Sequence, residues 1–338
     1  MEPTRRHSVA DIALQNQALV SAEAATRAAV IDRLRLGDAV FRHITRAAAY
    51  GVLLLLGGVI LALFLGALPS IQKFGLAFLV SEKWNPVTDE FAGLAPIYGT
   101  LVTSLIAMLI AVPVGLMIAF FLTELCPIWL RRPIAIAIEL LAGIPSIIYG
   151  IWGLFVFAPV LQQTLQPLLI DTFGNIPLIG ALFAGPPFGI GILTAGLILA
   201  IMVLPFITAI TRDVFEAVPP VLKEAAYGIG CTTWEVVRRV VLPYARVGVI
   251  GGVMLALGRA LGETMAVTFV IGNAHRISAS LLAPGTTISA VIANEFTEAV
   301  SPLYTASLIE LGLILFVITF IVLAIARYLL MRIERRIG

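Results

Sequence analysis

The chain has 338 residues, of which 60% are hydrophobic and 12% are charged, and its mean hydropathy is +1.03. Soluble domains carry about 25% charged residues, so this composition excludes a soluble globular protein and indicates a polytopic membrane protein. The net charge of +2 says little by itself, because only the positions of the basic residues predict orientation in a membrane.

Residues 1–47 form a polar, arginine-bearing N-terminal extension. It has no secretory signal pattern, because the first apolar run begins too late and is too long for a signal sequence. Residues 18–48 are compatible with an amphipathic helix lying on the inner membrane surface. A loosely ordered tail is the alternative.

Six apolar runs that are long enough to cross the hydrocarbon core follow the extension. We expect spans near residues 48–68, 98–122, 134–160, 189–211, 244–271 and 304–326. The predicted fold class is therefore an all-α integral membrane protein with six transmembrane helices. Prolines such as Pro113, Pro145 and Pro205 fall inside these spans, where neighbouring helices can satisfy the freed backbone groups.

Basic residues predict the orientation, because cytoplasmic segments of membrane proteins are enriched in Lys and Arg. With the N-terminus inside, the outer loops hold only Lys73, Lys83 and Arg276, and Arg259 lies within a span. All the other Lys and Arg residues then fall on the inner side. We predict that both termini are cytoplasmic.

The three predicted outer loops cover residues 69–97, 161–188 and 272–303. They contain Trp84, Asn85, Phe173, Asn175, His275, Arg276, Asn294, Glu295 and Glu298. We expect them to form a structured surface with short helices. Either simple packing of the loops or docking of a partner would explain that surface.

The longest inner loop, residues 212–243, does not have the composition of a flexible tether. Apolar residues recur in it at roughly helical spacing, and Gly228 and Gly230 interrupt the pattern. We therefore expect two short helices with a bend between them, ended by Pro243, where the next span begins. Such helices could insert into a groove on a soluble partner or lie on the bilayer.

A spaced motif in this loop favours the docking interpretation. It consists of Glu224, Ala225, Ala226, Gly230, Val240, Leu242 and Pro243. The motif resembles the EAA loop of binding-protein-dependent ABC importer permeases. The resemblance implies a type I (MetI-like) permease fold over residues 48–338. It also implies that residues 212–243 couple this domain to an ATP-binding subunit.

The resemblance extends over residues 48–326, through segments such as ELLAGIPSIIYGIWGLFVFAP and GGVMLALGRALGETMAVTFVIGN. These segments are similar to the PstC family of phosphate importer permeases. The family implies a second, PstA-like permease, two copies of a PstB-like ATPase and a PstS-like periplasmic binding protein as partners. It also implies no cofactor in this chain, because ATP and Mg would be bound by the ATPase.

Arg259 and Glu263 are the candidate residues of the substrate pathway. Arg259 lies roughly 22 Å along the span from Tyr244, and a charge at that depth costs on the order of 3 kcal/mol unless it faces protein or a polar path. Glu263, four residues on, would share its helix face. A self-neutralising pair that fixes packing is one interpretation.

The other interpretation is an anion relay, because a guanidinium donates paired hydrogen bonds to an oxyanion. Glu263 could accept a hydrogen bond from protonated phosphate, which sulfate cannot donate at neutral pH. The resemblance favours the relay, since Arg259 and Glu263 match charged positions of the family's pathway helix. Glu139 and Glu310 are further carboxylates that could lie in the membrane.

Motifs for catalysis or metal binding are missing from the sequence. It has no GxxxxGK[ST] loop, no HExxH, no GxSxG and no clustered His and Cys residues. The histidines His7, His43 and His275 are scattered and are expected to be solvated. Cys126 and Cys231 are expected to be reduced thiols on the inner side. We expect no catalytic and no metal-binding residues in this chain.

The sequence thus predicts the inner-membrane permease subunit of a bacterial ABC importer for inorganic phosphate, with ATP hydrolysed by a separate subunit. One alternative is a secondary anion transporter that works alone and uses Glu263 as a proton carrier. Another alternative is an ABC permease for a different oxyanion, such as molybdate or sulfate.

Overall fold

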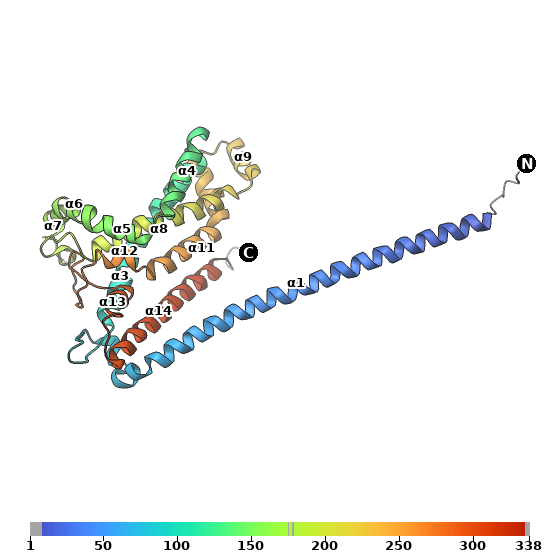
Figure 1. Ribbon diagram of the computed structural model, residues 1–338. Coiled ribbons are helices and arrows are strands. Elements are labelled where there is room, and N and C mark those ends of the chain that lie inside the picture. The colour runs from blue at the N-terminus through green and yellow to red at the C-terminus, as the bar shows by residue number, and fades with distance from the viewer. Residues whose placement is uncertain (1–8, 175, 178, 335–338) are drawn as a thin grey trace, which may run out of the picture. The chain divides into compact units, whose positions relative to one another are not determined.

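The computed structural model describes residues 9–174, 176–177 and 179–334, and within them the side chains of 9–36, 39, 329–330 and 333–334 are left aside (Figure 1). The elements in the described part are helices, apart from one isolated bridge between Asn85 and Glu90. The chain divides into two compact units, Met1–Ala62 and Leu63–Gly338. The interpretations of His7 and Asn175 fall outside the described residues.

A single helix, α1 (Val9–Phe74), supplies the first unit and continues into the second. The backbone over residues 18–48 is therefore helical, as in the first of the two predicted alternatives. No break in the helix marks the predicted end of the extension at residue 47, because α1 runs through it.

Within the described residues, six helical segments are long and apolar enough to cross a membrane, which confirms the predicted number. They are Val40–Phe74, Leu94–Leu125, Ser146–Phe173, Ile192–Glu216, Thr233–Leu261 and Pro302–Tyr328. Predicted spans one, two and six lie inside these segments, and the fourth lies almost wholly inside its counterpart. The third and the fifth differ from the prediction.

The prediction of one span over 134–160 is wrong, because the helix is broken at Pro145. Helix α4 (Ile128–Ala142) ends before it and α5 (Ser146–Trp152) begins after it. Proline has no N–H to donate and pushes the residue before it out of the helical region. The third span continues from α5 through a π turn, Gly153–Phe157, into α6 (Ala158–Gln163) and α7 (Leu165–Phe173).

The prediction of a fifth span over 244–271 is wrong at both ends. The span begins with α10 (Thr233–Val236) and a π turn, Val237–Val241, and continues as α11 (Leu242–Leu261). Pro243 therefore lies inside a continuous helical run, where the wider π turn before it accommodates its ring. Beyond α11 the chain leaves the helix and forms only the short α12 (Met265–Thr268).

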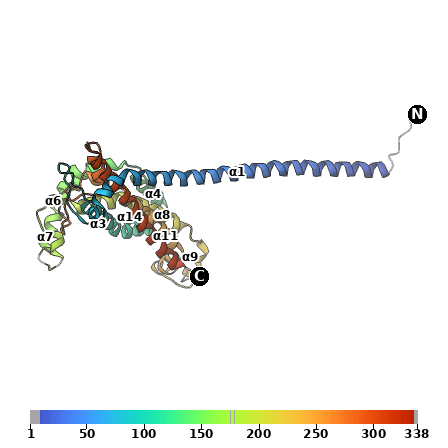
Figure 2. The same ribbon diagram turned by 90° about the horizontal axis from the view of Figure 1, so that it is seen from below.

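Helix α8 (Ile192–Glu216) lies at the centre of the second unit, where it packs against α3 (Leu94–Phe120), α4 and α11 (Figure 2). Small residues permit this packing. A Cβ atom on Gly196 would lie 2.7 Å from Cγ2 of Ile106, so α3 and α8 approach closely there. At Gly258 on α11, by contrast, a Cβ would meet Leu323 at an ordinary 3.7 Å.

The remaining helices lie toward the two ends of this unit (Figure 1). The π helix Phe121–Leu125 and α9 (Pro220–Gly228) lie at one end with α4. The other end holds α2 (Ala77–Val80), the 3-10 turn Gly180–Phe183, α13 (Ile288–Glu295) and the start of α14 (Pro302–Glu334). The predicted outer loops thus share the end opposite α9.

Replacing Gly99 by alanine tests the packing of this opposite end. A Cβ there would overlap the backbone carbonyl oxygen of Thr286, which cannot swing aside as a side chain can. We expect Gly99→Ala to lower the free energy of unfolding by about 1–3 kcal/mol, seen as a lower thermal midpoint in detergent. Gly251→Ala is the matched control, since it is also helical and has no atom within 4 Å. Equal midpoints for the two variants would contradict this packing.

Candidate functional site

The predicted coupling motif forms α9 and the turn after it, followed by α10. The first short helix and the bend are confirmed, but the second predicted helix is wrong, because α10 continues through the π turn into the fifth span instead of ending at Pro243. Ala226 is buried in a cluster with Phe215, Val236 and Val241, whereas Glu224 and Ala225 are exposed. One face of α9 therefore packs on the end of α8, and the motif's acidic residue lies on the free face.

An ion pair also holds α9 in place. The Lys223 ammonium lies 2.6 Å from Oε1 of Glu124, in the π helix that ends the second span, and both side chains are mostly buried. The ammonium also approaches the Phe215 carbonyl oxygen at 3.5 Å. These contacts tie the coupling helix to two spans.

The bend at Gly230 is a specific helix-ending turn. Gly230 has a φ of +90°. Its N–H donates to the Tyr227 carbonyl, and the Cys231 N–H donates to the Ala226 carbonyl. This is the Schellman pattern, which favours glycine because a Cβ is strained in the left-handed region. The motif's glycine is thus explained by its backbone conformation.

A capping box begins the next helix. The Thr232 side chain accepts from the Glu235 N–H, and the Glu235 carboxylate accepts from the Thr232 N–H. The direction of α10, and hence of the whole run to Leu261, is therefore set directly after the bend.

Large apolar side chains remain uncovered around the bend. Val221 is 71%, Ile229 83% and Trp234 61% exposed. The predicted apolar positions thus divide into two sets, because Val237 and Val241 are buried while these three face outward. An apolar surface of this kind beside charged groups is typical of a protein contact.

Arg259 lies in the last turn of α11, on a face that the described residues leave exposed. Leu255, one turn earlier, is 69% exposed on the same face. The guanidinium carbon lies 4.4 Å from the ring centroid of Phe206 on α8, a cation–π contact. The helix dipole also favours a cation at this C-terminal turn.

Glu263 does not share a helix with Arg259, contrary to the prediction, because α11 ends at Leu261. No ion pair joins these two described residues within 4.0 Å. The Glu263 carboxylate instead accepts a hydrogen bond of 3.5 Å from the Ala266 N–H. Ala260 and Ala266, on either side of the break, both belong to the buried core around α8. Buried core residues therefore flank the break, whereas Gly262 within it is exposed and Glu263 is partly exposed.

The two further carboxylates have other environments. Oε1 of Glu139 lies 2.8 Å from the guanidinium of Arg212, at the end of α8, so Glu139 is paired with Arg212 and not with Arg259. Glu310 on α14 is only 6% exposed and borders a largely apolar cavity of about 670 Å³. Neither Glu139 nor Glu310 therefore lies on the face of α11 that carries Arg259.

Glu295 organises the end of the molecule opposite α9. Its carboxylate accepts from Trp84 Nε1 at 2.7 Å and from the Tyr304 hydroxyl at 2.6 Å, and His275 Nε2 lies 2.8 Å away. Burial opposes ionisation of Glu295, but the hydrogen bonds from His275, Tyr304 and Trp84 outweigh it and lower the pKa of the carboxyl. The expectation of a solvated His275 is wrong, because its ring also stacks on Trp84 at 5.1 Å.

Within the described ranges, no group of three His, Cys, Asp or Glu side chains could hold a metal ion. Cys126 and Cys231 are both free thiols.

Gly230→Ala tests the helix-ending turn. Holding alanine at a positive φ costs about 1–2 kcal/mol, so we expect faster hydrogen exchange of the α9 amides. Gly228→Ala is the control, because it is helical and both positions have open space for a Cβ. The strained turn is contradicted if both variants exchange alike.

Comparisons with known proteins agree with this architecture. Residues 111–335 match the family described as binding-protein-dependent transport system inner membrane component. A relative from Mesorhizobium japonicum, described as phosphate transport system permease protein PstC, is 69% identical over 95% of this chain and 98% of its own. A protein of the same description from Pasteurella multocida is 58% identical over 89% of this chain and 94% of its own.

A solved bacterial ABC transporter, involved in the import of the acidic polysaccharide alginate, has a chain with the same fold. It superposes with a TM-score of 0.51 at 17% identity, covering 80% of this chain and 96% of that one. The predicted six-helix type I importer permease fold is confirmed, as is a multi-pass location in the inner membrane. The chain belongs to the family of binding-protein-dependent transport system inner membrane components, among its PstC permeases.

Proposed function

We propose that this chain is the membrane permease subunit of a bacterial ABC importer that moves inorganic phosphate across the inner membrane. Its relatives described as phosphate permeases support the substrate. The observation that carries the proposal is the helix break after Leu261, with Arg259 and Glu263 beside it. Non-helical backbone at membrane depth is tolerated only where it is buried in protein or lines a water-filled cavity.

Arg259 is the proposed phosphate-contacting residue of the pathway. Its guanidinium stays charged at any relevant pH and can donate two parallel hydrogen bonds to an oxyanion. The cation–π contact with Phe206 orients it without neutralising it. Glu263, which is not engaged in an ion pair with Arg259, would accept a hydrogen bond from protonated phosphate and so disfavour sulfate.

A second permease subunit, PstA-like, would cover the exposed face of α11. Val247, Leu255 and Arg259 lie on this face, and a charged group there cannot be left against lipid without a large cost. The pathway would then run between the two permeases, with each chain supplying one wall.

The free surface of α9 and α10 would dock into a PstB-like ATPase, two copies of which would bind ATP and Mg. Glu224, Val221, Ile229 and Trp234 form that surface. Because helix runs unbroken from Thr233 to Leu261, a displacement of the docked segment would move Arg259 with it. A PstS-like binding protein would deliver phosphate at the opposite end.

A stand-alone secondary carrier gives no role to this exposed coupling surface. The family to which the chain belongs works with a separate ATPase and a binding protein. The other alternative is an ABC permease that imports molybdate or sulfate. Measuring the uptake of each anion distinguishes it from a phosphate importer.

Arg259→Gln tests the pathway. Charge-assisted hydrogen bonds are worth about 1.5–3 kcal/mol each, so we expect uptake of labelled phosphate to fall at least tenfold, ~1.4 kcal/mol. Cells without their own phosphate importers would express the chain with its partner subunits. Arg327→Gln, a charge loss on exposed α14, is the control and keeps uptake. Normal uptake by Arg259→Gln would show that Arg259 only supports packing, and uptake of sulfate or molybdate in place of phosphate would overturn the substrate.

Glu224→Lys tests the docking surface. Reversing an exposed charge at a contact should abolish co-purification of the ATPase while membrane insertion is kept, because α9 itself is held by Lys223 and Ala226. Glu82→Lys, an equally exposed reversal at the opposite end, should co-purify the ATPase normally. Unchanged capture by both variants would place the ATPase contact elsewhere.

A further inference from the structure

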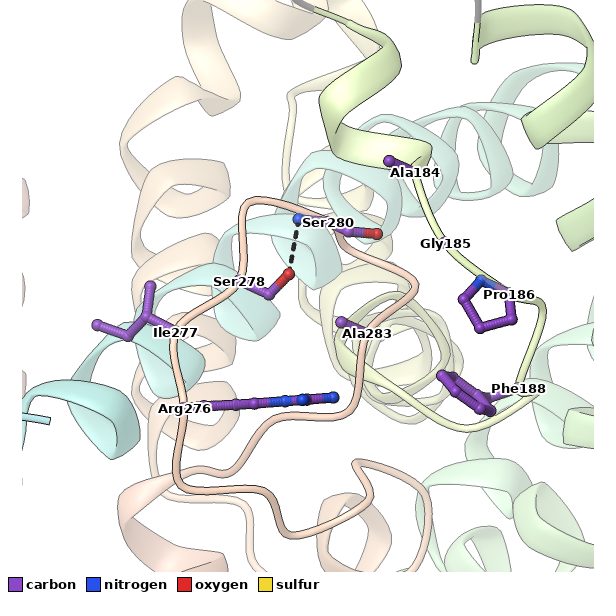
Figure 3. Close-up of a pocket in the computed structure, with 9 residues that line it drawn as sticks. All are labelled: Ala184, Gly185, Pro186, Phe188, Arg276, Ile277, Ser278, Ser280 and Ala283. Atoms are coloured by element: carbon purple, nitrogen blue, oxygen red, sulfur yellow. Dashed lines mark hydrogen bonds between the residues drawn. The ribbon is translucent and has the colours of Figure 1, made fainter. Parts of the chain in front are cut away.

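A second polar site lies at the end of the molecule opposite α9. Two loops, residues 184–188 and 276–283, enclose a cavity of about 290 Å³ (Figure 3). Among the described residues, Arg276 is the one charged residue that lines it, and its side chain extends from its loop toward Phe188. Ser278 and Ser280 contribute the hydroxyl groups, and no described carboxylate lines the cavity.

The hydrogen-bond donors of this cavity are unused. Among the residues that the structure describes, the Arg276 guanidinium has no hydrogen-bond or ion-pair partner. The Ser278 hydroxyl oxygen accepts from the Ser280 N–H at 3.1 Å, and the Ser280 oxygen accepts from the Leu282 N–H at 3.2 Å. Neither hydroxyl donates its own proton to a described residue. The guanidinium and the two hydroxyl protons of the lining residues are therefore free to donate to a ligand that is an acceptor.

The cavity is built on fixed backbone. The Tyr98 hydroxyl on α3 donates to the Ser278 carbonyl at 3.0 Å. The Leu281 N–H donates to the Leu182 carbonyl at 2.8 Å, which joins the two loops, and the Leu281 carbonyl accepts from the Leu193 N–H at the start of α8. Ser280 is 6% exposed, so one donor is held at the buried wall. Donors held in this way lose little entropy when a ligand binds.

We propose that this cavity is an oxyanion site that holds phosphate at the receiving end of the permease, before the anion reaches Arg259. The inference rests on the proposed function as a phosphate importer. Paired hydrogen bonds from Arg276 and single ones from Ser278 and Ser280 suit the oxygens of a tetrahedral anion.

Charged residues of both signs lie in the outer loops at this end of the molecule. They include the acidic Glu82, Asp89, Glu90 and Glu298, which repel an anion, and the basic Lys73 and Lys83, which attract one. Because its described lining residues include a guanidinium and no carboxylate, the cavity lacks a strong acceptor that would favour a protonated oxyanion. We therefore infer that it binds phosphate and sulfate alike, and that discrimination occurs deeper, beside Glu263.

Protection of an introduced thiol measures this site directly. Ala184 is exposed and lines the cavity, so Ala184→Cys can be labelled by a membrane-impermeant maleimide in the assembled importer, with the parent complex as background. We expect saturating inorganic phosphate, and equally sulfate, to slow labelling severalfold relative to chloride. Ala184→Cys combined with Arg276→Gln should lose this protection, whereas the combination with Lys83→Gln should keep it.

Phosphate uptake by the same complexes distinguishes the proposed cavity site from the proposed function as a phosphate importer. Arg276→Gln should weaken the apparent affinity for phosphate by about tenfold, as expected for loss of a charge-assisted contact, and Arg276→Lys should restore part of it. If Arg276→Gln is protected and transports like its parent while the parent takes up phosphate, the cavity site is wrong and phosphate import stands. Protection that needs the loaded binding protein, and never free phosphate, would instead make the cavity a docking site for a partner's carboxylate. Absence of phosphate uptake in the parent would refute the proposed function itself.

Discussion

The cost of leaving a charge or an unpaired backbone group in hydrocarbon constrains this chain more than any other factor. Arg259 lies on a face of α11 that the described residues leave exposed, and the backbone beside it leaves the helix after Leu261. Phe206 on α8 contacts the guanidinium but brings no opposite charge. Among the described residues, Arg259 has no ion-pair partner. The hydrogen-bond and ion-pair partners of the guanidinium must therefore come from water, an anion or a second subunit.

Helix α8 connects that face to the coupling segment. Its middle belongs to the buried core that contains Ala260 and Ala266, and its end contributes Phe215 to the cluster under α9. The continuous helix from Thr233 to Leu261 provides a second connection, because the π turn before Pro243 keeps the helix unbroken. Two packed helices thus join the end that holds α9 to the helix break, which suits movement of the two regions as one body.

Local features of the sequence predicted much of this. Hydropathy gave the number of spans, because hydrocarbon thickness fixes their length. The bend at Gly230 could be predicted because its cause is the local backbone conformation. The breaks at Pro145 and after Leu261 were missed, since both lie within long apolar runs where hydropathy is the same for helix and for turn. The stacking of His275 on Trp84 joins two distant loops and leaves no local signal.

By itself, the sequence determined the membrane class, the number of spans, the coupling motif and the resemblance to importer permeases. Only the tertiary structure decided which charges meet. It paired Glu139 with Arg212, left Arg259 without Glu263, and placed Arg276 in one cavity with a loop about ninety residues earlier. Composition and motif spacing depend on neighbours along the chain, whereas these contacts depend on where helices cross and end, and that is set by packing between segments far apart in sequence.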